Sequence, residues 1–143
     1  DALFLLAQIE TNEGNTAAAI KQVEKASQLN PNDATIFFRL GLLRYNNQDY
    51  AGAVGSFEQA VVLDNAYLNA RYFLGLAYQK VGRTGEALIQ FNILNKVLPD
   101  NADVKKAIDS LSKFPEPAAP TVTTDTKTTD TKAADTKLPT KKQ

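Results

Sequence analysis

The residue types that most often carry out catalysis are missing from this chain. Its 143 residues include no histidine and no cysteine. The usual general base, the thiol nucleophile and the commonest metal ligands are therefore absent. Lysine, tyrosine, serine, threonine and the carboxylates remain. The lack of cysteine also excludes a disulfide or thiolate metal site, but it is compatible with reducing and oxidising compartments alike.

Carboxylate chemistry would need two acidic side chains that converge on one pocket. Glu10 and Glu13 share a helical face, but they lie beside a predicted turn, where charged side chains are ordinarily solvated. Asp100 and Asp103 frame the start of a predicted helix, where the helix dipole favours negative charge. Residues 82–85, Gly-Arg-Thr-Gly, form a turn signal rather than a phosphate-binding loop. We therefore expect no enzyme, no cofactor and no metal site.

The strongest pattern in the chain is a period of 34 residues. Identical residues recur at this spacing: Leu40 and Leu74, Gly41 and Gly75, Ala53 and Ala87, and Phe57 and Phe91. A fixed period of this size is typical of stacked units, each of which buries its apolar face against its neighbours. The period predicts a repeat architecture, and such architectures present binding surfaces more often than reactive pockets.

Each unit has the pattern of two short amphipathic helices joined by a tight turn. In the middle unit, two apolar runs at helical spacing are separated by the polar stretch 46–49. Proline ends the second helix of a unit because it cannot continue a helix, and Asp or Asn can cap the next one. The predicted helices span residues 2–12, 16–29, 34–47, 50–63, 67–81, 84–98 and 102–113.

With these motifs the chain resembles the tetratricopeptide repeat family, whose unit is 34 residues long with Leu-Gly, Tyr, Ala, aromatic and Pro residues at set positions. The matching residues are Leu6, Gly14, Ala19, Ala26 and Pro31 in the first unit, Phe37, Leu40, Gly41, Ala53, Phe57 and Ala60 in the second, and Leu74, Gly75, Tyr78, Ala87, Phe91 and Pro99 in the third. The resemblance implies an all-α fold, an alpha-alpha superhelix (solenoid) of three helix pairs plus a C-terminal capping helix.

The resemblance also implies a domain organisation. A tetratricopeptide repeat domain would cover residues 1–114, with units at about 1–33, 34–67 and 68–101 and the capping helix at 102–113. After it the chain is rich in Thr, Lys and Asp and has almost no side chains to bury. Ordering such a segment would cost conformational entropy without a compensating core, so we expect residues 115–143 to be a disordered tail.

Small residues at two positions have a structural role. Gly41 and Gly75 let the first helix of a unit approach its second, where a larger side chain would overpack the contact. Three positions depart from the repeat. Arg44 stands where Tyr78 stands one unit later, Asn65 replaces the turn proline as a tolerated turn residue, and Leu94 replaces a small residue. We expect Leu94 to loosen the last pair unless the capping helix fills the space.

The resemblance further implies that the first helix of each unit lines the concave side of the superhelix. Aromatic, aliphatic and amide residues occupy the corresponding positions: Phe4, Gln8, Asn12, Phe38, Leu42, Tyr45, Asn46, Asn69, Tyr72, Leu76 and Gln79. Two interpretations remain open. The aromatic rings could be core residues of a short array. Alternatively, they could form apolar platforms flanked by amides, across which an extended peptide or an amphipathic helix binds.

The charges of the chain favour a protein or peptide as the partner. Lysine plus arginine and aspartate plus glutamate both number 16, and the chain has neither the basic stripe of a nucleic-acid binder nor a basic amphipathic or membrane-spanning segment. Some members of the family grip the C-terminal carboxylate of chaperones with groove cations. The corresponding positions here are Phe4, Gln8, Arg39, Asn69 and Phe73, so that clamp is not expected.

The leading hypothesis is therefore a non-catalytic scaffold or adaptor that binds a peptide or a partner's helix in the concave groove. The alternative is a structural spacer within a larger envelope or membrane protein, which would mediate assembly or self-association. No methionine is present and the first helix lacks a capping segment, so we expect this chain to be the C-terminal piece of a longer protein. No signal peptide is visible, and the compartment stays open.

Overall fold

The computed structural model describes residues 14–113, which form six α-helices and no strand. The helices are α2 (Thr16–Leu29), α3 (Ala34–Asn46), α4 (Tyr50–Leu63), α5 (Leu68–Lys80), α6 (Thr84–Val97) and α7 (Ala102–Ser112). The predicted helices from residue 16 onward are confirmed, each within one residue of its predicted bounds. The predicted helix 2–12 and the predicted tail 115–143 lie outside the described residues.

Short polar side chains begin four of these helices. Asn15, Asp33, Asp49 and Asn101 stand at the N-caps of α2, α3, α4 and α7, and each side chain accepts a hydrogen bond from a backbone N–H of the first turn. Such caps satisfy backbone donors that have no partner inside the helix. The spacing of Asp and Asn along the sequence thus explains where these helices start.

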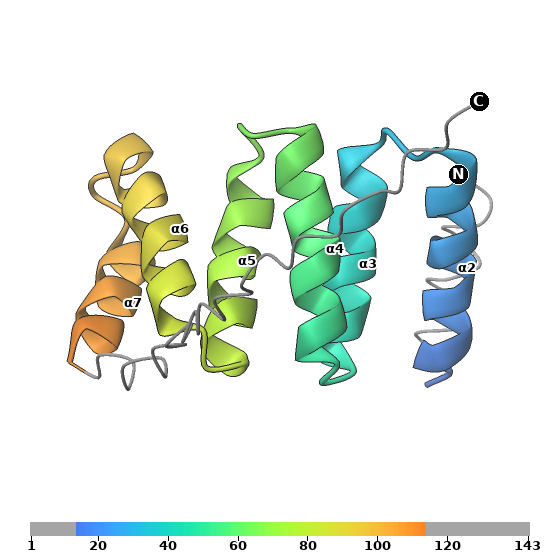
Figure 1. Cartoon of the computed structure of the whole chain (residues 1–143), viewed down its shortest axis with the longest axis horizontal. Helices are drawn as coiled ribbons and strands as arrows, with labels where there is room; N and C mark the ends of the chain where they lie inside the picture. Colours follow the sequence, from blue (N-terminus) through green and yellow to red (C-terminus); the bar gives the residue numbers. More distant parts are fainter. Residues whose placement is uncertain (1–13, 114–143) are drawn as a thin grey trace, which may run out of the picture.

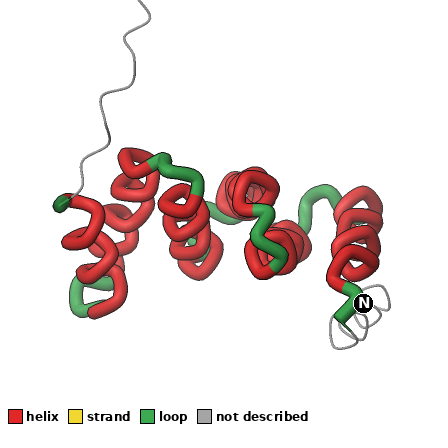
Figure 2. Tube along the Cα trace, turned by 90° about the horizontal axis from the view of Figure 1, so that it is seen from below, coloured by secondary structure: helices red, strands yellow, loops and turns green. Residues whose placement is uncertain are grey.

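The helices form two rows that run the length of the molecule. Neighbours in sequence pack against each other from α2 through to α7 and alternate in direction (Figure 1). Viewed along the helix axes, α2, α4 and α6 lie in one row and α3, α5 and α7 in the other (Figure 2). We call the surface formed by α3, α5 and α7 the first-helix face, because these are the first helices of their units.

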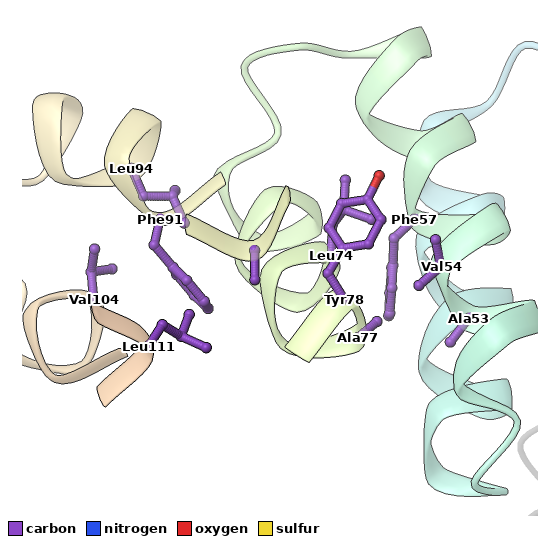
Figure 3. Close-up of a cluster of buried hydrophobic side chains, with 11 residues drawn as sticks. Ala53, Val54, Phe57, Leu74, Ala77, Tyr78, Phe91, Leu94, Val104 and Leu111 are labelled. Atoms are coloured by element: carbon purple, nitrogen blue, oxygen red, sulfur yellow. The ribbon is translucent and has the colours of Figure 1, made fainter. Parts of the chain in front are cut away.

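The main core runs between the rows from α4 to α7. The rings of Phe57 and Phe91 are fully buried in it, and Leu74, Leu94 and Val104 are nearly so (Figure 3). A smaller cluster joins α2 to α3 through Ala19, Val23 and Leu40. Each unit therefore buries its apolar residues against the next unit, as the 34-residue period predicts.

The two predicted close approaches are present. A Cβ atom added to Gly75 would lie 2.8 Å from Cζ of Phe91, and one added to Gly41 would lie 2.5 Å from Cδ1 of Phe57. Carbon atoms do not approach so closely without a shift of one partner, and both rings are held on all sides by the core. Glycine is therefore required where the ring of the second helix lies on the first.

Leu94 does not loosen the last pair, because the capping helix α7 fills the space beside it. Its side chain is 1% exposed and packs in the same cluster as Val104 and Leu111 of α7. Figure 3 shows Leu94, Val104 and Leu111 gathered around Phe91. The capping helix supplies the space and the contacts that a larger residue at position 94 needs.

One turn position is strained. Gly14, Gln48 and Gly82 are repeat-equivalent, and all have positive φ angles, of 81°, 63° and 80° respectively. Glycine adopts this left-handed region freely, whereas a residue with a Cβ atom does so at a cost of about 1–2 kcal/mol. Gln48 therefore carries strain that the equivalent glycines avoid.

Replacement of this strained residue should stabilise the fold. We expect Gln48→Gly to raise the free energy of unfolding by about 0.5–1 kcal/mol, because relief of the strain exceeds the extra entropy that glycine gains in the unfolded chain. Urea denaturation followed by circular dichroism measures the change. A destabilised Gln48→Gly variant would contradict the assignment of strain, and Gly82→Ala serves as the reciprocal control that should lose stability.

Two helix glycines form a matched pair for a second test. We expect Gly75→Ala to destabilise the fold by about 1–3 kcal/mol, because the new methyl group would overlap the ring of Phe91. Gly55 lies in α4 with nothing within 4 Å of its added Cβ, so Gly55→Ala should stabilise the fold by about 0.5–1 kcal/mol. Equal effects of the two substitutions in thermal denaturation would refute the packing account.

Candidate functional site

The predicted groove residues within the described part of the chain all lie on α3 and α5. The aromatic and aliphatic ones are half-buried: Phe38, Leu42, Tyr45, Tyr72 and Leu76. The amides are exposed: Asn46, Asn69 and Gln79. Phe4, Gln8 and Asn12 lie outside the described residues. The arrangement on α3 and α5 is that of a partly open apolar surface with polar side chains along it.

Phe38 is held mainly by packing. Its ring centroid lies 4.9 Å from that of Tyr67, 5.8 Å from that of Phe73 and 5.9 Å from that of Phe57. Leu42, Tyr45, Tyr72 and Leu76 also pack against the core cluster while remaining partly exposed. The two interpretations of the sequence are therefore compatible, since each of these side chains contacts the core and also remains accessible to solvent.

Four rings form a continuous row, which we call the aromatic strip: Tyr50, Tyr45, Phe73 and Tyr72. The centroids of successive rings are 5.1, 6.3 and 5.8 Å apart, and each pair meets edge to face. Edge-to-face contact is a favourable geometry for aromatic pairs. The strip joins the end of α3, the start of α4 and the middle of α5.

Sequence reasoning missed two members of the strip. Tyr50 begins the second helix of its unit, so it falls outside a search confined to first helices. Phe73 occupies a position at which members of the family can place a groove cation, so its sequence position suggested a test of charge and not of packing. The cluster of tyrosines at 45 and 50 is a sequence signal that could have found the first of these.

The hydroxyl groups of the strip are available to a ligand. Among residues 14–113, Tyr78 is the tyrosine whose O–H donates a hydrogen bond to another residue, while Tyr45, Tyr50 and Tyr72 make none there. Burial raises the pKa of Tyr45, and the nearby hydroxyls of Tyr50 and Tyr72 raise it further. The Tyr45 hydroxyl therefore stays protonated at neutral pH and can act as a donor.

A hollow of about 180 Å³ opens between α5 and α7 beside Tyr72. Its lining residues are Leu68, Asn69, Tyr72, Leu94, Leu98, Asn101, Asp103 and Val104. Two of the predicted groove residues, Asn69 and Tyr72, therefore line the same hollow. The start of α7 also contributes Asn101 and Asp103, which sequence reasoning had assigned only to the start of a helix. The hollow is large enough for one side chain, but it is smaller than most small-molecule sites.

Two equivalent polar contacts fasten the first helices that carry these residues. Arg44 of α3 binds Oε1 of Glu24 through Nη2 at 2.6 Å, and Tyr78 of α5 donates its O–H to Oε1 of Glu58 at 2.5 Å. Glu24 and Glu58 are repeat-equivalent, each on the second helix of the preceding unit. Arg44 therefore makes the same contact with a glutamate as Tyr78 does, although through a guanidinium instead of a phenol. The contact of Arg44 helps to hold α3 in place, as that of Tyr78 holds α5.

No group of three potential metal-ligating side chains gathers among residues 14–113. At the start of α7, Asp100 lies 3.9 Å from Lys105, and Asn101 caps the helix by accepting from the N–H of Asp103. Asp100 and Asn101 thus contact the first turn of α7. No helix in this part of the chain has the length and apolar character needed to span a bilayer.

Comparison with known proteins agrees with the repeat seen in the structure. A sequence profile described as TPR repeat matches residues 7–48. The first TPR of Spaghetti (RPAP3), bound to the HSP90 peptide SRMEEVD, superposes with a TM-score of 0.71 over 78% of this chain and 89% of that one, at 18% identity. The sequence profile and the shared fold support assignment of this chain to the tetratricopeptide repeat family. Its fold is an all-α tetratricopeptide repeat superhelix.

Other tetratricopeptide repeat proteins are similar to a comparable extent. The Yersinia enterocolitica type III secretion chaperone SycD, in complex with a peptide of the translocator YopD, has a TM-score of 0.69 at 18% identity and matches 78% of this chain and 91% of that one. Anaphase-promoting complex subunit 3 of Schizosaccharomyces pombe is 27% identical over 119 residues, which is 73% of this chain and 18% of that protein. The chain thus spans less than a fifth of this relative.

The contact between Tyr78 and Glu58 has a consequence for pH dependence. Burial, the hydrogen bond to Glu58 and the charge of that carboxylate, in this order, raise the pKa of Tyr78 from 10.0 to about 12. Because the neutral phenol is favoured in the folded state, this group leaves stability unchanged below about pH 10. Stability should then fall as the pH rises from about 10 to about 12.

The titration can be followed by the ultraviolet absorbance of tyrosinate. We expect one tyrosine to titrate near pH 12, to vanish in Tyr78→Phe, and to titrate at lower pH in Glu58→Gln, because the carboxylate acceptor and its charge are lost. A Glu58→Gln variant that leaves the late titration in place would show that Glu58 does not hold the Tyr78 hydroxyl.

Proposed function

We propose that this chain is a non-catalytic protein-interaction module that binds a peptide or a partner's helix along α3 and α5, in the concave groove of the repeat array. The observation that carries the proposal is the aromatic strip. Its rings are half-buried, its tyrosine hydroxyls make no hydrogen bond within the described residues, and exposed amides lie on the same helices. Such a surface offers apolar contact and hydrogen-bond donors together.

The structural neighbours support this use of the fold. The RPAP3 domain was solved with an HSP90 peptide and SycD with a YopD peptide. Both are similar to this chain along most of its length, although at low sequence identity. A peptide ligand is therefore within the capacity of the architecture, and the side chains of this chain must decide which peptide it binds.

The residues of α3 and α5 argue against an acidic ligand of the HSP90 type. The peptide SRMEEVD carries several carboxylates, which need cations to compensate their loss of hydration. At the positions where the family can place such cations, α5 has Asn69 and Phe73, and Arg39 supplies the charge on α3. We therefore propose an uncharged or weakly charged partner segment.

Site-specific photocrosslinking tests the proposed face. A photoreactive amino acid at Gln79, which is exposed at the end of α5, should crosslink the full-length chain to a partner in lysate of the source cell. The same group at Asn92, which is exposed on α6 in the other row, is the matched control and should give no product. Products from Asn92 alone would place the binding surface on the opposite row.

A charge variant separates loss of binding from loss of folding. Asn46→Glu with Gln79→Glu adds two carboxylates to the first-helix face, and Ala51→Glu with Asn92→Glu adds two to exposed positions of the other row. All four sites are exposed, so both variants should keep their circular dichroism spectra and melting temperatures. Only the first should lose the crosslinked partner. Retention of the partner in both would favour a purely architectural role.

A further inference from the structure

The accessible groups of the aromatic strip are hydrogen-bond donors. The hydroxyls of Tyr45, Tyr50 and Tyr72 can donate hydrogen bonds, and the exposed amides of Asn46 and Gln79 lie at the ends of α3 and α5. Lys80 adds a further donor, with Nζ 5.7 Å from the centroid of the Tyr50 ring. A ligand that suits this surface should present apolar faces together with backbone carbonyl groups.

Helical partners match this donor set poorly. The backbone carbonyl groups in the body of an α-helix are already paired within the helix. A partner helix would therefore cover the tyrosine hydroxyls and amides without offering them backbone acceptors, and buried donors without partners are costly. The donor-rich surface favours a ligand whose backbone is free.

A polyproline II segment has the complementary features. It makes no internal hydrogen bonds, so its carbonyl groups point outward, and its proline residues bring apolar rings and no N–H donors. It repeats every three residues, or about 9 Å. Tyr45 and Tyr72 both contact the ring of Phe73, at 6.3 and 5.8 Å, so their ring centroids are at most about 12 Å apart. This upper limit is compatible with the repeat of about 9 Å, so that successive ligand turns could meet the two tyrosines.

The electrostatics of the strip are consistent with an uncharged ligand. The groups that act on the hydroxyl of Tyr45 are the two neighbouring tyrosines. Asp49, the carboxylate next to Tyr50 in sequence, caps α4 by accepting from the N–H of Gly52 and lies 4.0 Å from Nε of Arg44. The strip thus offers rings, hydroxyls, amides and one lysine, and these donors are complementary to an uncharged ligand that is rich in hydrogen-bond acceptors.

We infer that the aromatic strip formed by Tyr50, Tyr45, Phe73 and Tyr72 is a recognition site for a proline-rich peptide in the polyproline II conformation. The inference rests on the proposed function and names the ligand class of the same face. Proline rings pack on the exposed sides of the strip's rings, and the hydroxyls of Tyr45 and Tyr72 donate to ligand carbonyl groups. Aromatic grooves that bind proline-rich segments in this way benefit from the low conformational entropy of the free peptide.

Fluorescence anisotropy with the full-length chain tests the inference. The probe is a labelled decaproline peptide, and a labelled Gly-Ser peptide of equal length is the control. We expect the chain to bind decaproline and not the control peptide. Tyr45→Phe and Tyr72→Phe keep the packed rings and remove only a donor, so each should weaken binding about 2- to 10-fold. Asn92→Ala changes an exposed residue of α6 in the other row and should leave the affinity unchanged.

The outcomes separate this inference from the proposed function. Failure to bind decaproline, with binding of an amphipathic helical peptide that is lost in Asn46→Glu with Gln79→Glu, overturns the inference and leaves the proposed face intact. Decaproline binding that is unaffected by both strip variants also overturns it, because the peptide would then bind elsewhere. Binding of neither peptide, with no crosslink from Gln79, overturns both.

Discussion

The seating of a phenylalanine ring on a glycine is the contact on which the rest of this structure depends. In two successive units the ring of the second helix lies where a Cβ atom of the first would be, Phe57 on Gly41 and Phe91 on Gly75. This contact sets how closely the helices of a pair approach. The stacking of the pairs follows from it, and the stacking in turn brings Tyr45 and Tyr72 from different units into contact with one ring, Phe73.

The 34-residue period predicts the fold well because the information is local and repeated. Helix bounds follow from caps and turn residues, and the glycine and alanine positions follow from the close approach that each pair requires. Contacts between units are less predictable. Arg44 and Tyr78 differ in charge and shape, yet each meets the equivalent glutamate of the preceding unit. A period shows that two positions are equivalent. It does not show that different side chains at those positions contact the equivalent residue of the preceding unit.

The candidate site was predictable in outline only. The predicted residues of α3 and α5 do combine half-buried apolar side chains with exposed amides. Tyr50 was missed because it belongs to a second helix, and Phe73 because its position had been considered for charge rather than for packing. The hollow beside Tyr72 also depends on α7, whose Asn101 and Asp103 had been assigned only to a helix start. Contributions from neighbouring elements appear only once the helices are stacked.

Mapping of amide chemical shifts by nuclear magnetic resonance tests the central claim most directly, namely that the face formed by α3 and α5 is the binding surface. The full-length chain, labelled with nitrogen-15, would be titrated with decaproline and, in parallel, with a peptide from any partner crosslinked at Gln79. The account predicts that the largest shifts cluster around Tyr45, Tyr50 and Tyr72. Shifts concentrated on α2, α4 and α6 away from Tyr50, or absent with both ligands, would contradict it.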